Sequence, residues 1–216
     1  MKKENSIIVW TLPIALSMTI ICFAALFSLH FRGLYYWDIE YLSISQDAHM
    51  DEDQIRQNYD ILVDYMTDEK IEKLAFPNFG MSREGEIHFK EVKDIFILIK
   101  RLMYGLGIYS IMGILVSIIK KRYKFIKYTA MGILAGPACL LLVAMIDFDK
   151  SFVIFHNLAF SNTYWIFDPV KDPVIMILPQ DYFLHSFLLI VGIVLIIALI
   201  LTILYRVIRD QIKMEE

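Results

Sequence analysis

Two histidines of this 216-residue chain, His88 and His156, are candidates for proton transfer. Each lies on a predicted helix that borders a polar segment, next to the aromatic residue Phe89 or Phe155. A neutral imidazole can take up a proton near pH 7 and return it, so histidine is the usual general acid or base of enzymes. For either histidine alone, a structural role is the simpler interpretation. As a pair, they suggest a shared acid–base site.

The segment 152–179 concentrates further chemical groups between two long apolar runs. Its polar and aromatic candidates are Asn157, Asn162, Tyr164, Trp165, Asp168 and Asp172. An aspartate before a proline, as at Asp168 and Asp172, favours a turn or extended backbone. A second role for these aspartates, in orienting a histidine, is the alternative. The aromatic residues fit either an interfacial belt or the wall of a groove for an acyl chain.

Signatures of other enzyme classes do not occur in the sequence. It has no His-Glu-x-x-His zinc motif, no Gly-x-Ser-x-Gly nucleophile turn and no glycine-rich phosphate loop. The cysteines Cys22 and Cys139 fall inside apolar runs, which argues against a thiol nucleophile at a membrane surface. His30, His49 and His185 lie in contexts that indicate nothing specific. We interpret these three as satisfied surface or interfacial side chains.

A metal ion held by His88 and His156 is the main chemical alternative to acid–base use. Such a site needs a third ligand, for which Glu86 and Asp168 are the candidates. The sequence shows no tight pair of ligands at helical spacing. We therefore expect neither a metal nor another cofactor.

The rest of the chain has the composition of a membrane protein. Hydrophobic residues make up 57% of it, and the mean hydropathy is +0.54. Long apolar runs of this kind are typical of transmembrane helices. The sequence therefore predicts an all-α integral membrane protein, with four transmembrane helices at about 6–29, 102–119, 128–146 and 183–205.

Basic residues indicate which side of the membrane each connection occupies. Lysine and arginine are concentrated in 1–5, 120–127 and 206–216, and short segments rich in these residues stay in the cytoplasm. The longer connections 30–101 and 147–182 are richer in acidic residues and are expected outside. Both termini are then cytoplasmic, and the two outer loops form a small extracytoplasmic cap.

One amphipathic helix is expected within the first outer loop. Apolar residues recur at helical spacing over 51–74, and Asp51 and Gln54 have the arrangement of a capping box. Its acidic residues are most simply a solvated face. Further along, the helical period that begins at His88 continues into the run 102–119. His88 is therefore expected near the start of the second membrane helix.

The polar segments also resemble a known family. The residues Phe155-His156-Asn157-Leu158-Ala159-Phe160, followed by Trp165-x-Phe167-Asp168-Pro169-x-x-Asp172, look like the second outer loop of the lipoprotein intramolecular transacylases (Lit) of Gram-positive bacteria. The run from Glu86 to Asp94 is similar to the matching first-loop motif, in which a histidine (His88) is followed by a Val-Lys helix entry (Val92-Lys93). The length, the four spans and the cytoplasmic termini fit the same family.

This resemblance implies an acyltransferase. Such enzymes move the sn-2 acyl chain of a diacylglyceryl-cysteine lipoprotein to its N-terminal α-amine, which gives a lyso-form lipoprotein. Two imidazoles, His88 and His156, suit this reaction as base and acid, in either order, without an enzyme nucleophile. Candidates for supporting residues or for an oxyanion donor are Arg83, Glu86, Asn157, Asn162, Tyr164, Trp165, Asp168 and Asp172.

The resemblance also implies a setting. The expected partners are a diacylglyceryl-modified lipoprotein and membrane lipid, not nucleic acid. The expected location is the cytoplasmic membrane of a Gram-positive bacterium, with the active site at the outer leaflet. Two alternatives remain at this point. One is a non-enzymatic membrane sensor or accessory protein whose outer cap binds a partner through the acidic face of 47–72. The other is a metal-dependent membrane hydrolase.

Overall fold

The computed structural model describes the chain from residue 8 to residue 215, and the side chains of residues 8–9, 136–146 and 215 lie outside this description. The predicted cytoplasmic segment 1–5 and the side chain of Cys139 are therefore not among the described residues. Throughout the described part, every regular element is a helix, which confirms the all-α class. In order they are α1 (Ile8–His30), α2 (Arg32–Tyr41), α3 (Ile44–Asp47), α4 (Glu52–Thr67), α5 (Arg83–Ile119), α6 (Lys124–Ile146), α7 (Phe148–Ala159), the 3₁₀ helix η1 (Pro173–Ile177) and α8 (Gln180–Glu215).

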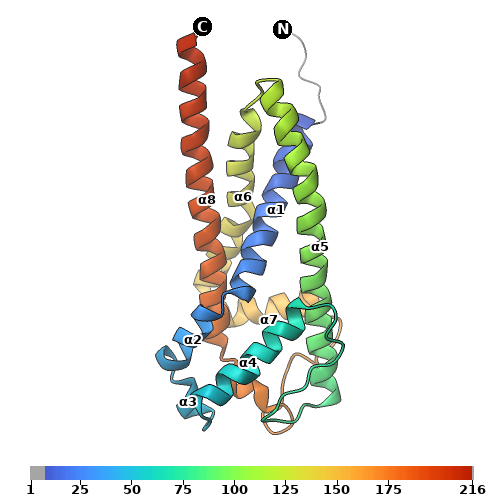
Figure 1. Cartoon of the computed structure of the whole chain (residues 1–216). Coiled ribbons are helices and arrows are strands. Elements are labelled where there is room, and N and C mark those ends of the chain that lie inside the picture. The colour runs from blue at the N-terminus through green and yellow to red at the C-terminus, as the bar shows by residue number, and fades with distance from the viewer. Residues whose placement is uncertain (1–7, 216) are drawn as a thin grey trace. The chain divides into compact units, whose positions relative to one another are not determined.

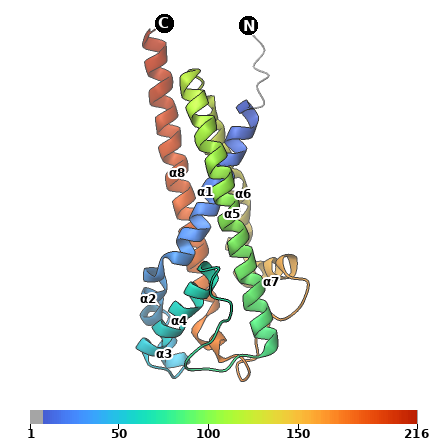
Figure 2. The same ribbon diagram turned by 45° about the vertical axis from the view of Figure 1, so that its right-hand side comes forward.

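The helices divide into two compact units. The first contains the described residues of Met1–Ala25, Ile99–Leu142 and Leu189–Glu216, and the second contains Leu26–Leu98 and Val143–Leu188. The first unit consists of long stretches of α1, α5, α6 and α8 (Figures 1 and 2). The second unit contains the short helices, together with the beginnings of α5 and α8.

Three helices of the described part are long and apolar enough to cross a membrane: Trp10–His30, Arg83–Ile119 and Gln180–Met214. Since about 20 residues suffice for a bilayer, only part of α5 can be the crossing segment. The segment from Arg83 to Arg101, both ends included, carries nine charged residues, which leaves the predicted stretch 102–119 as the apolar part. The predicted span 128–146 corresponds to α6, much of whose side-chain structure lies outside the description. The count of four spans therefore stays a prediction.

Close helix contacts in the first unit depend on small residues. A Cβ atom added to Gly113 of α5 would lie 2.7 Å from Cδ1 of Leu12, a fully buried side chain of α1. The hydroxyl groups of Thr11 and Tyr109 form a hydrogen bond of 2.6 Å between the same two helices. Small residues let helix backbones approach closely, as membrane helices often require.

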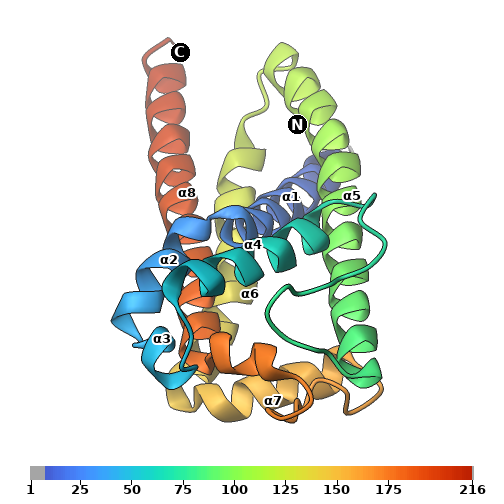
Figure 3. The same cartoon turned by 60° about the horizontal axis from the view of Figure 1, so that its bottom comes forward.

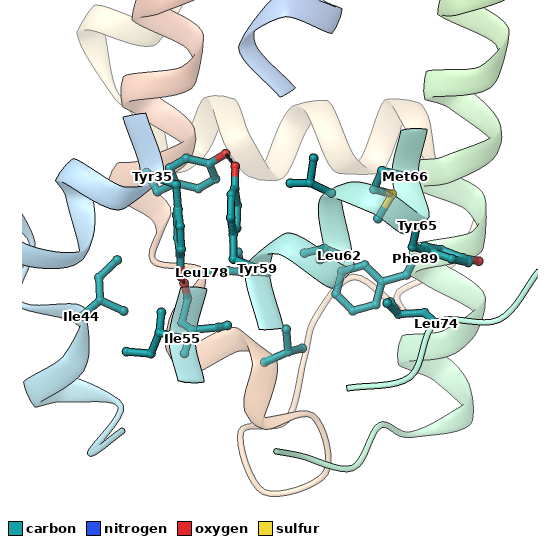
Figure 4. Packing of buried hydrophobic residues seen from close by; sticks show 14 of the residues in the cluster. Tyr35, Ile44, Ile55, Tyr59, Leu62, Tyr65, Met66, Leu74, Phe89 and Leu178 are labelled. Carbon is teal, nitrogen blue, oxygen red and sulfur yellow. Dashed lines mark hydrogen bonds between the residues drawn. The ribbon is translucent and has the colours of Figure 1, made fainter. Parts of the chain in front are cut away.

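The second unit has its own hydrophobic core, organised around two buried tyrosines. The rings of Tyr35 on α2 and Tyr59 on α4 lie face to face, with centroids 3.6 Å apart (Figure 4). The Tyr35 hydroxyl donates to the carbonyl oxygen of Ile177 at 2.6 Å, and the Tyr59 and Tyr182 hydroxyls share a hydrogen bond of 2.6 Å. Each buried hydroxyl therefore has a partner, and the two bonds connect α2 and α4 to η1 and α8.

The amphipathic helix expected over 51–74 is α4, which ends earlier than predicted, at Thr67. Asp51 caps its start, because the Asp51 side chain accepts a hydrogen bond from the backbone N–H of Asp53 at 3.2 Å. Beyond Thr67 the chain runs without regular structure to α5 (Figure 3). The buried ammonium group of Lys93 donates hydrogen bonds to two backbone carbonyl oxygens of this segment, those of Asp68 and Ile71. A tertiary contact thus replaces the helical hydrogen bonds that the local pattern predicted.

Candidate active site

The first turn of α5, which leads to His88, is held by a buried aspartate. Asp172 is only 3% exposed, and its two carboxylate oxygens accept hydrogen bonds from the N–H (2.7 Å) and the hydroxyl (2.8 Å) of Ser82. The Ser82 hydroxyl in turn accepts from the N–H of Gly85 at 3.0 Å, which caps the helix. A Cβ atom on Gly85 would overlap the Asp172 carboxylate. Asp172 therefore fixes the helix start and leaves room only for glycine.

His88 lies on this helix in an aromatic environment. Its side chain is 5% exposed, and the rings of Phe160 and Phe167 meet it edge-on, with centroids at 4.7 Å and 5.5 Å. Its Nδ1 atom is buried and has no hydrogen-bond partner among the described residues. A buried polar atom without a partner is uncommon and requires an explanation, such as a catalytic role.

His156 lies on α7, a short helix whose start is capped by Asp147. The Asp147 carboxylate accepts from the backbone N–H of Lys150 at 3.0 Å. Near the other end of α7, Nδ1 of His156 lies 2.8 Å from the carbonyl oxygen of Phe152. Since a carbonyl oxygen only accepts hydrogen bonds, Nδ1 carries the proton and Nε2 keeps a free lone pair. The rings of Phe152 and Trp165 pack beside the imidazole, with centroids at 4.1 Å and 4.8 Å.

The structure brings the two predicted histidines together. The ring centroids of His88 and His156 are 6.1 Å apart, although the residues lie on different helices. Phe160, the residue that follows α7, contacts both rings, with centroids at 4.7 Å and 5.7 Å. Two imidazoles at this separation can both contact one small group of a substrate. The opening to lipid that an acyl substrate needs stays a prediction.

Burial keeps both imidazoles neutral. It lowers the pKa of His88 to about 4, with a smaller contribution from the neighbouring His156. Burial also lowers the pKa of His156, although the Phe152 carbonyl opposes that shift by accepting the Nδ1 proton. A neutral His156 near pH 7 has its Nε2 lone pair available, as a general base requires.

The loop after α7 places Trp165 beside His156 and connects Asn162 to α5. The side-chain oxygen of Asn162 accepts from the N–H of Tyr164 at 3.0 Å, and its Nδ2 donates to Oε1 of Glu91 at 2.8 Å. Nε1 of Trp165 is buried without a partner among the described residues. Glu91 is not among the site residues predicted from the sequence. Its position three residues after His88, on the same helix face, was the available signal.

The remaining predicted site residues lie elsewhere in the same unit. Arg83 and Glu86 are exposed on α5, and Asn157 is exposed on α7. Asp168 is exposed, and its Oδ1 accepts from the backbone N–H of Val170 at 2.9 Å, as expected for a turn. Because the Phe152 carbonyl orients His156, neither aspartate of the Asp-Pro pairs is needed for that role. No group of three or more His, Cys, Asp or Glu side chains in the described part is arranged to hold a metal ion.

A second histidine makes a polar contact that the sequence did not predict. His185, for which nothing specific was expected, has its Nδ1 2.6 Å from Oδ1 of Asp38. Asp38 is fully buried, and its burial raises the pKa of the carboxyl group, while His185 acts in the opposite direction. The rings of Trp37 and Tyr41 lie beside His185, with centroids at 5.8 Å and 5.7 Å. This pair connects α2 to α8.

Comparisons with known proteins identify the family to which the chain is similar. Residues 10–183 match the family model described as lipoprotein intramolecular transacylase Lit. The solved structure of the membrane-integral lipoprotein intramolecular transacylase Lit from Bacillus cereus is similar, with a TM-score of 0.93 and 34% identity over 96% of each chain. Two structures of that protein carry a single histidine replacement. The arginine variant has a TM-score of 0.87 and 33% identity over 97% of this chain and 93% of that chain. The alanine variant has a TM-score of 0.87 and 34% identity over 96% and 94%. Among curated proteins, nothing matches.

Proposed function

Because this chain belongs to the Lit family of lipoprotein intramolecular transacylases, which are enzymes, we propose that it moves the sn-2 acyl chain of a diacylglyceryl-cysteine lipoprotein to the α-amine of that cysteine. The product is an N-acyl, S-monoacylglyceryl lipoprotein, the lyso form. One structural observation supports assigning this reaction to the chain. The ring centroids of two neutral imidazoles, His88 and His156, lie 6.1 Å apart in an aromatic environment.

The reaction exchanges one bond for another within a single substrate. The α-ammonium first releases one proton to solvent, and the neutral amine nitrogen attacks the carbonyl carbon of the sn-2 ester. The carbon–nitrogen bond forms, the nitrogen gives up a second proton, the ester carbon–oxygen bond breaks, and the glyceryl oxygen gains a proton. Because donor and acceptor belong to the same molecule, holding them in position supplies much of the rate enhancement. The enzyme then needs no nucleophile of its own.

His156 is the favoured base, because its Nε2 keeps a free lone pair while Nδ1 is committed to the Phe152 carbonyl. It takes the proton from the amine nitrogen and delivers it to the glyceryl oxygen. His88 is neutral and donates a hydrogen bond to that oxygen as the carbon–oxygen bond breaks. This division resembles the use of neutral imidazole donors where negative charge develops.

Trp165 is the favoured oxyanion donor among the candidates. The negative charge on the ester carbonyl oxygen requires a donor in the transition state. Nε1 of Trp165 is a buried N–H without a partner among the described residues, and its ring lies 4.8 Å from that of His156. Asn162 is already committed to Glu91 and Tyr164, and Arg83 and Asn157 are exposed.

The proposed setting follows from the charges and from the family. The basic connections 120–127 and 206–216 favour cytoplasmic termini, with the site at the outer leaflet of the cytoplasmic membrane of a Gram-positive bacterium. The substrate is then a diacylglyceryl-modified lipoprotein held in that leaflet. The sensor hypothesis is set aside, because the family is one of enzymes.

Mass spectrometry tests this proposal directly. A lipoprotein is co-expressed with the chain in a host that lacks such an enzyme, and its N-terminal lipopeptide is fragmented. We expect one acyl group to move from oxygen to nitrogen at constant total mass. Loss of the acyl group from the lipopeptide would instead indicate a hydrolase, and an unchanged lipopeptide would contradict the proposed reaction.

A further inference from the structure

Glu91, three residues after His88 on α5, presents a buried carboxylate oxygen without a partner among the described residues. Its Oε1 accepts from Nδ2 of Asn162 at 2.8 Å, whereas its Oε2 is buried and has no hydrogen-bond partner among the described residues. The neighbouring lysines have other partners. Lys90 pairs with Asp94 at 2.8 Å, and the ammonium of Lys93 donates to backbone carbonyl groups. A carboxylate oxygen in this position is complementary to a donor that comes from outside the chain.

Asn162 holds this carboxylate in a defined orientation. The N–H of Tyr164 donates to Oδ1 of Asn162, so the amide nitrogen must face Glu91. Glu91 lies three residues after His88 on α5, and Asn162 lies six residues after His156 along the chain. The Glu91–Asn162 hydrogen bond therefore connects the two segments that carry the histidines.

We infer that Glu91, oriented by Asn162, is the binding subsite for the α-ammonium group of the substrate's N-terminal residue. This inference rests on the proposed function, in which a primary ammonium must approach His156 before it loses a proton. A carboxylate only accepts hydrogen bonds, and its pairing with an ammonium is charge-assisted. Residues three apart on a helix share a face, so an ammonium bound at Glu91 lies on the His88 side of α5.

The inference predicts selectivity for a free amine, separately from catalysis. The test uses two probes in which ether bonds replace the esters of a dialkylglyceryl-cysteinyl peptide, one with a free α-amine and one with an acetylated amine. Neither probe can react. Binding to the full-length protein in detergent is measured for the unaltered protein, for Glu91→Gln and for the control Glu84→Gln, an exposed position on α5.

We expect the unaltered protein and Glu84→Gln to bind the free-amine probe at least about tenfold more tightly than the acetylated probe. In Glu91→Gln the ratio of the affinity for the free-amine probe to that for the acetylated probe should fall close to one, while the affinity for the acetylated probe stays unchanged. Thermal unfolding shows which variants are folded, and Glu91→Ala is measured in the same way. A preference that persists in either folded Glu91 variant would overturn the inference. Lyso-form product from the unaltered protein would then still support the proposed function, so the two failures are distinguishable.

Discussion

Asp172 holds Ser82 through both of its carboxylate oxygens, across 90 residues of sequence. This contact joins the segment before η1 to the start of α5, six residues ahead of His88. The position of the His88 imidazole therefore depends on a side chain that is distant in the sequence.

Replacement of Asp172 by alanine should destabilise the fold. The change removes two hydrogen bonds to a buried carboxylate and leaves the Ser82 groups without their partner, at a cost of about 2 kcal/mol. Thermal unfolding measures this loss. The matched control is Asp168→Ala, which removes only an exposed turn contact and should cost about 0.5 kcal/mol. Equal effects of the two replacements would show that the contact with Ser82 has no special role.

Stability should decrease below pH 6.5 through His88. Its folded-state pKa of about 4 lies below the ordinary value of 6.5, so the unfolded chain binds more protons between these two values. Lowering the pH from 7 to 5 should therefore cost about 2 kcal/mol through this group. His156 acts in the same direction, because its pKa is also lowered.

Unfolding of the unaltered protein and of His88→Gln at the two pH values checks this prediction. The variant, which cannot take up the proton, should lose less stability over the same interval. If both proteins respond equally to pH, His88 does not have the lowered pKa.

The Asp38–His185 pair should be cooperative. His185→Ala leaves the buried Asp38 carboxylate without its partner, which should cost about 3 kcal/mol. The double replacement Asp38→Asn with His185→Ala should cost less than the sum of the single replacements, because no unpaired charge remains. Thermal unfolding of the four proteins measures the coupling, and strictly additive losses would contradict a direct interaction.

Trp165→Phe should reduce catalysis while the fold stays intact. Phenylalanine preserves an aromatic ring beside His156 but removes the unpartnered N–H, so lyso-form production should fall on the order of 100-fold if that N–H contacts the oxyanion. Trp10→Phe, on an exposed part of α1, is the control and should have no effect. Unchanged production in Trp165→Phe would assign the oxyanion contact to another group.

The two histidines could be selected from the sequence because each lies next to a recognisable local sequence pattern. His88 precedes a helical period that continues into an apolar run, and His156 lies in a loop with an unusual density of polar and aromatic groups. Both features are local in sequence, and a family resemblance covers the same residues.

Other parts of the site depend on contacts that no local pattern contains. Glu91 meets Asn162 across 71 residues, and Asp38 meets His185 across 147. A long-range contact also accounts for the early end of α4. The ammonium group of Lys93 donates hydrogen bonds to backbone carbonyl oxygens of the segment that was predicted to be helical. Long-range contacts of this kind override the local preference for a helix. They can be identified only in the folded structure.

In the proposed mechanism His156 transfers the proton that acyl migration requires, and His88 donates a hydrogen bond to the leaving oxygen, so both imidazoles are needed. The most direct measurement is the fraction of lyso-form lipopeptide that membranes containing His88→Ala or His156→Ala produce, with the amount of inserted protein determined in the same membranes. The account predicts that each variant inserts normally and yields less than about 1% of the product of the unaltered protein. Near-normal product from both variants would contradict it.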